Sequence, residues 1–166
     1  MERYVLGIDA GTESIRTGIY NEKGDCISFG CSENTNIHQH PGWCEQSVQQ
    51  WTDSMVESIR LAFKDSPVRP EQIEGVGIDG TSCTVVHLDS EGKPLRDAIM
   101  WMDIRAAKEA DDIAACGDGA LKYVGHGKVS AEWFPCKNLW VKRHEPEIYA
   151  QASTIFEHTD WIAYWL

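Results

Sequence analysis

An acid, a glycine and a guanidinium group follow one another closely near the start of this 166-residue chain, in a spacing that suits phosphate binding. Gly11 lacks a Cβ, so its backbone can take a positive φ and let a bulky anion approach the chain. Thr12 and Ser14 can donate hydroxyl hydrogen bonds and Arg16 can supply charge, while Asp9 can hold a hydrated Mg²⁺ against phosphate oxygens. The pattern predicts a turn that binds a phosphate group.

The alternative is an ordinary hairpin whose acid and hydroxyls only satisfy the backbone of the turn, because motifs this short recur by chance. Both interpretations need the same local structure. An apolar run from Tyr4 to Ile8 precedes Asp9, and Ile15, Thr17 and Ile19 alternate as in a returning strand. We therefore predict a β-hairpin with the acid at its mouth.

A third strand and a helix are predicted next. Residues 26–32 read as a third strand, with Ile27, Phe29 and Cys31 on one face. The domain is therefore expected to begin with three antiparallel strands. Ser47 and Gln50 form a capping box at the start of a helix that should lie on the sheet. The apolar residues of that helix fall at helical spacing: Val48, Trp51, Met55, Ile59, Ala62 and Phe63.

The first arrangement is then repeated. Residues 74–79 form a short apolar strand that again ends in an acid, Asp79, and is again followed by small polar residues. Residues 85–88 continue as a strand, and Asp103 is a plausible N-cap for a helix over residues 104–116. Pro135 is expected to be the first residue of a helix that runs to about residue 144.

Composition narrows the class of protein. The chain is long enough for one domain with a real core, with 42% hydrophobic residues. A formal net charge of −11 argues against a nucleic-acid partner, and no apolar run is long enough for a membrane span. No secretory h-region follows the N-terminus, so we expect a cytoplasmic protein without a membrane partner.

Six cysteines are scattered without a C-x-x-C pair, which favours reduced thiols over a disulfide framework or a zinc site. Most of them are expected in the core. His38, His40 and Cys44 share a loop, but no fourth ligand stands at a recognisable spacing, so a metal site there is disfavoured.

Taken in order, these motifs resemble the N-terminal part of the FGGY carbohydrate kinases. The resemblance covers nearly all of the chain, and the order of five individually weak motifs gives it its specificity. The residues that carry it are Asp9 to Thr12 with Arg16, Pro41 to Gln46 with Trp51, Gly77 to Thr81, Trp101 to Ala106, and Lys137 with Asp160.

The resemblance implies an actin-like, ribonuclease-H-like α/β fold, with a mixed sheet flanked by helices. In such kinases two domains close over ATP, Mg²⁺ and a sugar or polyol. Residues 1–166 would then be the N-terminal, sugar-binding-side domain, truncated before its end, with the C-terminal domain absent. Such a fragment is expected to be inactive alone.

The resemblance also implies roles for single residues. Asp9 and Arg16 would be catalytic, with Asp9 the metal-associated acid near the transferred phosphate. Gly11, Thr12 and Ser14 would bind the cofactor. Phosphoryl transfer asks mainly for positioning and for charge against developing oxyanions, which suits this set.

The sugar side is predicted at a second group of residues: Thr81, Ser82, Trp101, Asp103 and Glu132. Trp101 would form an apolar wall and the others would hydrogen-bond hydroxyls. Glycerol kinases have Arg-Glu and xylulokinases Met-His at the positions of Ser82 and Cys83, and both pairs are missing here. The segments of residues 78–84, 101–103 and 130–133 look more like ribulokinase-type members.

Structural alternatives stand beside these roles. Asp79 can simply end a strand, Asp103 can be a helix cap, and Trp101 can be plain core. Lys137 lies on a predicted helix face, where a structural ion pair is favoured over contact with a ligand.

We therefore predict an ATP-dependent carbohydrate kinase that transfers the γ-phosphoryl group to a hydroxyl of a pentulose such as ribulose. Kinases of xylulose, glycerol, erythritol or a hexulose on the same scaffold are the alternatives within the family. A non-catalytic binding module of the actin-like ATPase superfamily is the alternative from another class. A homo-oligomer is possible.

Overall fold

The computed structural model describes residues 2–125 and 128–166. The chain forms two compact units. Unit 1 consists of residues 1–36, 47–81 and 159–166, and unit 2 consists of residues 37–46 and 82–158. Each unit contains one four-stranded sheet.

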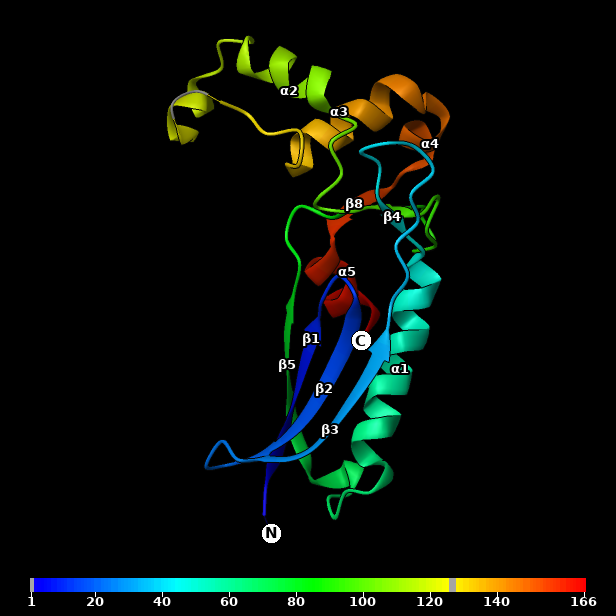
Figure 1. The fold of residues 1–166 in the computed structure, drawn as a ribbon, viewed down its shortest axis with the longest axis vertical. Helices are drawn as coiled ribbons and strands as arrows, with labels where there is room; N and C mark the ends of the chain where they lie inside the picture. The colour runs from blue at the N-terminus through cyan, green and yellow to red at the C-terminus, as the bar shows by residue number, and fades with distance from the viewer. Residues whose placement is uncertain (1, 126–127) are drawn as a thin grey trace. The chain divides into compact units, whose positions relative to one another are not determined.

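The strands and helices follow one another in a mixed order (Figure 1). The strands are β1 (Tyr4–Ala10), β2 (Ser14–Asn21), β3 (Cys26–Glu33), β4 (Glu45–Gln46), β5 (Ile73–Gly80), β6 (Val85–Leu88), β7 (Ala98–Ile99) and β8 (Thr154–Glu157). The α-helices are α1 (Val48–Lys64), α2 (Ala107–Ala114), α3 (Phe134–His144), α4 (Pro146–Gln151) and α5 (His158–Trp165). The part of the chain that the structure describes also contains the short 3₁₀ helices η1 (Pro70–Gln72) and η2 (Gly119–Tyr123).

The sheet of unit 1 has the strand order β3-β2-β1-β5. β1 pairs antiparallel with β2 and parallel with β5, and β2 pairs antiparallel with β3. Helix α1 lies along one face of this sheet (Figure 1). The predicted mixed sheet, with antiparallel first strands and a helix packed on it, is confirmed.

The face of the sheet under α1 is the core of unit 1. Leu6, Ile8 and Ala10 alternate along β1 and are buried there, as a strand with one covered face requires. On β3 the backbone of Gly30 comes so close to α1 that a Cβ would lie 2.1 Å from the Ser58 carbonyl oxygen. Glycine at this position therefore allows the helix to rest directly on the strand.

The start of α1 agrees only in part with the predicted capping box. Ser47 is the N-cap, and its hydroxyl accepts a hydrogen bond from the Gln50 amide. The Gln50 side chain does not return to the cap. It instead accepts from the Thr35 amide at 3.0 Å, because the loop before the helix passes beside it.

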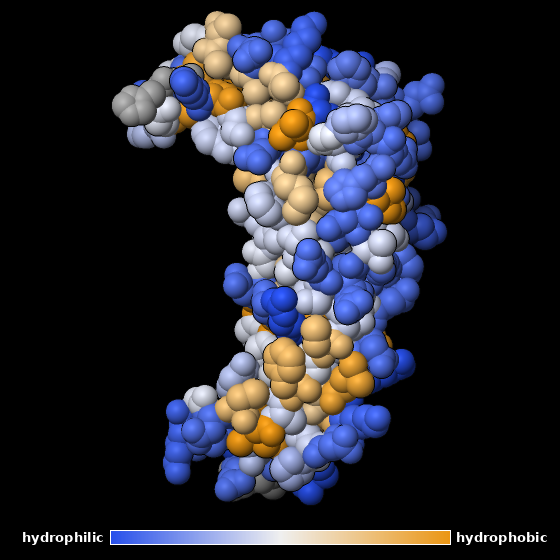
Figure 2. Space-filling model, viewed as in Figure 1, coloured by the Kyte–Doolittle hydropathy of each residue, from blue (hydrophilic) through white to orange (hydrophobic). Residues whose placement is uncertain are grey.

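The predicted shared face of Ile27, Phe29 and Cys31 on the third strand is wrong for Ile27. The register between β2 and β3 shifts between Ile19 and Tyr20, beside Ile27, which packs against the core, while Phe29 is 55% exposed. Cys31 is exposed as well. Phe29, Val5 and Val76 are exposed apolar side chains of this sheet, and Figure 2 shows hydrophobic surface gathered in this region.

Unit 2 is built on a sheet with the order β4-β7-β6-β8, in which all pairs are antiparallel. Its buried cluster joins Ile99 of β7 to Ala110 of α2 and to Trp140 and Val141 of α3. α3 begins at Phe134, one residue before the predicted start at Pro135, and this proline lies in its first turn. The helices of unit 2 thus pack on its short strands, and the loops that connect these strands and helices carry the remaining predicted site residues.

The predicted helix over residues 104–116 is shorter in the structure. α2 begins at Ala107 with Ala106 at the N-cap position, so Asp103 does not cap it. All six cysteines are free, as predicted, but the expectation that most of them lie in the core is wrong, because only Cys44 and Cys136 are buried. Among the described residues, no helix has both the length and the apolar composition needed to cross a bilayer.

Candidate functional site

Two copies of the same tripeptide lie side by side in the sheet of unit 1. Gly7, Ile8 and Asp9 of β1 are register partners of Gly77, Ile78 and Asp79 of β5. Because the two strands are parallel, both acids reach the carboxyl ends of their strands at the same edge of the sheet. The repeat was visible in the sequence, but Asp79 was not predicted as a site residue.

Arg16 reaches the same edge from the returning strand. It is the register partner of Asp9 in the hairpin, and its Nη1 atom donates to Asp9 Oδ2 at 2.8 Å. Both side chains are about half exposed, at 45% for Arg16 and 48% for Asp9. The hydrogen bond and the charge of Asp9 raise the pKa of Arg16 from its ordinary value.

The turn between β1 and β2 is closed by its own backbone. The Gly11 amide donates to the Ser14 carbonyl at 3.0 Å, and Asn34 at the end of β3 donates to the Gly11 carbonyl. Gly11 is not one of the residues with positive φ, so this part of the prediction is wrong. Thr12 is partly exposed, whereas Ser14 is 6% exposed.

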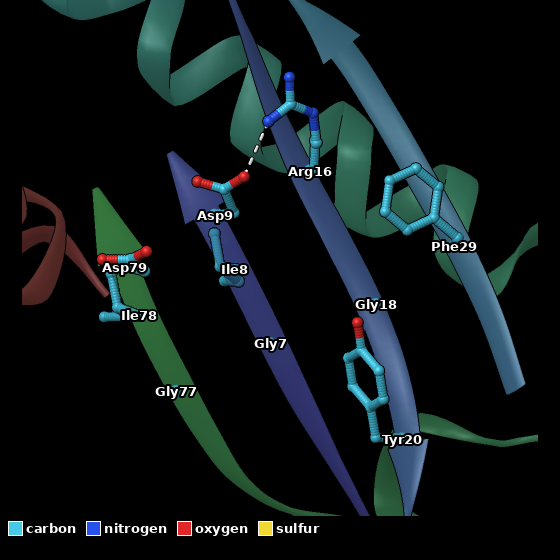
Figure 3. A pocket seen from close by; sticks show the side chains of 10 residues that line it. All are labelled: Gly7, Ile8, Asp9, Arg16, Gly18, Tyr20, Phe29, Gly77, Ile78 and Asp79. Carbon is cyan, nitrogen blue, oxygen red and sulfur yellow. Dashed lines mark hydrogen bonds and ion pairs between the residues drawn. The ribbon is translucent and has the colours of Figure 1, made fainter. Parts of the chain in front are cut away.

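A groove of about 430 Å³ runs along the uncovered face of the sheet below the acids (Figure 3). Its floor includes glycines on three neighbouring strands, Gly7, Gly18 and Gly77. The ring of Tyr20 lies over Gly18, where a Cβ would come within 2.6 Å of the ring. Asp9 and Arg16 therefore stand over an open strip of backbone.

This set of groups fits a magnesium-bound phosphate better than a metal held by protein alone. Among the described residues, no cluster of three or more possible ligands surrounds a point. Mg²⁺ is usually bound through one or two carboxylates plus phosphate oxygens and water, and Asp9 and Asp79 offer two carboxylates at an open edge. The hard oxygen donors suit that ion.

The predicted sugar-side residues of unit 2 lie on loops around α3. Trp101 is 39% exposed, so the alternative of a plain core residue is wrong. Its backbone is held at both polar atoms, since its amide donates to Thr84 Oγ1 at 3.1 Å and its carbonyl accepts from Lys137 Nζ at 3.0 Å. Glu132 is partly exposed, and its Oε2 atom accepts from Ser130 Oγ at 3.3 Å.

Asp103 is fully buried and holds two motifs of the sequence together. Its Oδ2 atom accepts from the Cys44 amide at 2.6 Å and from Arg105 Nη2 at 2.8 Å, and its Oδ1 atom accepts from Arg105 Nε at 2.9 Å. The Arg105 guanidinium lies 3.8 Å from the ring centroid of Trp43 and also donates to Glu45. Both oxygens of Asp103 are thus engaged within the protein.

Arg96 extends the same network. It donates to Glu45 and to Glu145, and its side chain is only 11% exposed. The segment of residues 41–46 and the segment of residues 101–106 therefore meet through charge-assisted hydrogen bonds. The sequence contained both motifs, but nothing in it indicated that they contact each other.

Lys137 was predicted to form a structural ion pair, and this is wrong. Its side chain is completely buried, and its ammonium donates to three backbone carbonyls, those of Cys83, Trp101 and Glu132. Burial lowers the pKa of Lys137 to about 8. Sequence spacing could not reveal these acceptors, because two of them lie far away along the chain.

The remaining two predicted residues fall on either side of the division between the units. Thr81 is the last residue of its segment in unit 1, and Ser82 is the first of its segment in unit 2. Thr81 is partly exposed and Ser82 is exposed. Their contact with a sugar stays a prediction, as do the ligand roles of Trp101, Asp103 and Glu132.

Known proteins share the sequence and the fold of this chain. The profile of the FGGY family of carbohydrate kinases, N-terminal domain, matches residues 4–166. A glycerol kinase from Streptococcus pyogenes serotype M6 is 33% identical over 154 residues, which is 92% of this chain and 31% of that protein. The chain thus spans about a third of the length of the relatives that it matches.

Solved structures agree with the profile. A xylulose kinase from Rhodospirillum rubrum is 27% identical with a TM-score of 0.89, and covers 99% of this chain with 34% of its own. A xyloylose kinase from Brucella ovis is 28% identical with a TM-score of 0.88 and the same coverage. A glycerol kinase from Plasmodium falciparum, solved with ADP, shares the fold at 22% identity, with a TM-score of 0.84 over 98% of this chain and 34% of its own.

The predicted actin-like, ribonuclease-H-like α/β fold is therefore confirmed. In this chain the fold carries Asp9 and Asp79 side by side at the carboxyl ends of two parallel strands, together with a buried network that joins residues 41–46 to residues 101–106. The chain belongs to the FGGY family of carbohydrate kinases and corresponds to their N-terminal domain.

Proposed function

We propose that the intact protein carrying this chain is an ATP-dependent carbohydrate kinase. The observation that supports this proposal most is the group of Asp9, Asp79 and Arg16 at one open edge of the sheet in an FGGY domain. Phosphoryl transfer needs little covalent chemistry from the protein and depends on positioning and on charge stabilisation. Two carboxylates and one guanidinium are groups that supply both.

Asp9 and Asp79 would hold Mg²⁺, which supplies positive charge against phosphate oxygens when it is bound. Arg16 can add a second positive charge because its backbone lies in β2 and its Nη1 atom already reaches this edge of the sheet. The turn at Gly11, Thr12 and Ser14 would lie against the phosphates. ATP is the proposed donor, in keeping with the ADP present in the glycerol kinase structure from Plasmodium falciparum.

The proposed acceptor is a pentulose or a related small polyol. Trp101 offers a partly exposed ring for a carbon face, and Glu132 offers a partly exposed carboxylate for hydroxyls. Asp103 contributes by fixing the segment that carries Trp101, since it is buried between Cys44 and Arg105. Relatives named for glycerol and xylulose support this class. The preference for ribulose rests on the resemblance of residues 78–84, 101–103 and 130–133 to ribulokinase-type members.

The test is a substrate panel on the intact protein. Ketopentoses, ketohexoses, glycerol and erythritol are supplied with ATP and Mg²⁺, and ADP formation is followed by a coupled assay. We expect acceptor-dependent ADP formation with a ketopentose, and its loss in the Asp9→Asn variant. Activity on glycerol alone would overturn the pentulose assignment. Nucleotide binding without acceptor-dependent turnover would instead favour a binding module.

A further inference from the structure

Lys137 joins three separate segments of unit 2 through one ammonium group. Its Nζ atom lies 2.8 Å from the Cys83 carbonyl oxygen, 3.0 Å from that of Trp101 and 2.5 Å from that of Glu132. The side chain rises from α3 and is completely buried. An ammonium has three N–H donors, and here each has an acceptor.

The three acceptors belong to the segments that carry the predicted sugar contacts. Trp101 and Glu132 are themselves predicted contacts, and Cys83 follows Ser82 directly. Because a backbone carbonyl moves with its peptide unit, a shift of the ammonium would move all three segments. The distance along the chain from Lys137 to Cys83 is 54 residues and to Trp101 is 36 residues, so this bond pattern exists only in the folded state.

The conformation of Cys83 shows that its segment needs such support. Cys83 has a φ of 61°, in the left-handed region, and is the one residue other than glycine with positive φ in the described ranges 2–125 and 128–166. This conformation is uncommon for a side chain with a Cβ and persists where the surroundings hold it. The hydrogen bond from Lys137 to its carbonyl is one contact that does so.

We propose that Lys137 is a positioning residue for the acceptor side of the site, which sets the places of the Ser82, Trp101 and Glu132 segments together through their backbone carbonyls. The inference rests on the proposed kinase function for its meaning, but the arrangement itself can be tested without activity. The three hydrogen bonds of the Lys137 ammonium all go to the segments of the acceptor side, so Lys137 is expected to govern acceptor affinity and to leave ATP affinity unchanged.

The hydrogen bonding by Lys137 is expected to depend on pH, because its side chain can lose a proton. The titratable groups that face it are Cys83, Asp103, Glu132 and Cys136, and Asp103 is already paired with Arg105. Burial lowers the pKa of Lys137 to about 8. A neutral amine has two N–H donors, so deprotonation leaves one of the three carbonyls without its bond.

The kinetic test compares Lys137→Met with Lys142→Met in the intact protein. Lys142 lies on the same helix but is exposed, so it is a matched control. We expect Lys137→Met to raise the acceptor KM about tenfold or more, with the ATP KM changed less than about threefold. The wild-type acceptor KM should rise above about pH 8, and this rise should be absent in Lys137→Met. Lys137→Arg, which keeps a charged donor, should recover part of the loss.

A second test does not depend on activity, and its main measurement is made on the wild-type protein. The intact wild-type protein is labelled with 5-fluorotryptophan, and the ¹⁹F signal of Trp101 is assigned by its loss in Trp101→Phe. We expect this signal to titrate with a midpoint near pH 8, and to do so equally in Cys83→Ser, which removes the nearby thiol.

The outcomes separate the two proposals. A protein without acceptor-dependent turnover but with the Trp101 titration would refute the kinase function and retain the positioning by Lys137. A Trp101 signal that is constant from about pH 7 to about pH 9.5 overturns the positioning role. An acceptor KM in folded Lys137→Met equal to that of Lys142→Met overturns it as well.

Discussion

Asp9 and Arg16 are paired twice, as register partners across the β1–β2 hairpin and as an ion pair with 2.8 Å between Oδ2 and Nη1. The strand pairing fixes the distance between the two backbones, so the two side chains are held within reach of each other. An exposed ion pair of this kind adds little to stability. Its value lies in holding a carboxylate and a guanidinium together at the open end of a groove.

Replacement of Asp9 should affect chemistry far more than folding. In the intact protein, we expect Asp9→Asn to lower kcat for acceptor-dependent ADP formation by about 10²-fold or more, because the amide neither holds Mg²⁺ nor balances Arg16. Glu22→Gln, which removes an exposed acid elsewhere in unit 1, is the control. Activity of Asp9→Asn within a few-fold of wild type would refute the assigned role.

Gly30 is expected to be indispensable for packing in unit 1. A Cβ there would lie 2.1 Å from the Ser58 carbonyl oxygen and 2.5 Å from the Ala62 amide nitrogen, and neither backbone atom can rotate away. We expect Gly30→Ala to destabilise the intact protein by about 2 kcal/mol or more, measured as a lower urea midpoint. Gly75→Ala is the control, because its nearest contact would be 4.0 Å away. Equal midpoints for the two variants would contradict this account of the contact between α1 and β3.

Arg105 should not tolerate a change to lysine. Its guanidinium makes two bonds to Asp103, one bond to Glu45, and a stacked contact with Trp43, all without exposure of its side chain. Lysine keeps the charge but loses the planar fork, so we expect a loss of about 2 kcal/mol in unfolding free energy. Arg143→Lys, at a 40% exposed side chain, should change stability by less than about 0.5 kcal/mol. Similar losses in both variants would show that the buried network has no special weight.

His87 should make the intact protein sensitive to mild acid. Burial, with a smaller contribution from Arg96, lowers the pKa of His87 from 6.5 to about 4. Between these values the unfolded chain binds a proton that the folded chain does not, so stability is full above pH 6.5 and is lost as the pH falls toward 4. The loss attributable to this residue is about 3 kcal/mol.

The measurement is urea unfolding at pH 7 and at pH 4.5. His87→Leu should show a smaller decrease in unfolding free energy between these values than wild type does. His40→Leu replaces an exposed histidine and should behave like wild type in this comparison. An unchanged pH dependence in folded His87→Leu would mean that other groups cause the acid sensitivity.

Local patterns in the sequence were sufficient for the elements of unit 1. The alternation at Ile15, Thr17 and Ile19, the apolar run before Asp9 and the spacing of apolar residues after Ser47 predicted the hairpin and α1, because strand and helix periodicity depend on neighbours close in the chain. The same logic failed for Ile27, since a register shift between β2 and β3 lies beside it and it packs against the core instead of sharing the exposed face of Phe29. It also failed for Asp103, because ion pairs with Arg105 compete with helix capping.

The sequence by itself determined the family, the order of the motifs, and the candidate acid and guanidinium at Asp9 and Arg16. Only the tertiary structure decided that Asp79 lies beside Asp9 and that Lys137 binds three distant carbonyls. The physical reason is that these relations depend on strand register and on backbone groups far apart along the chain. Every residue has the same backbone carbonyl group, so the residue types in a sequence do not indicate which carbonyls will accept hydrogen bonds from a buried ammonium.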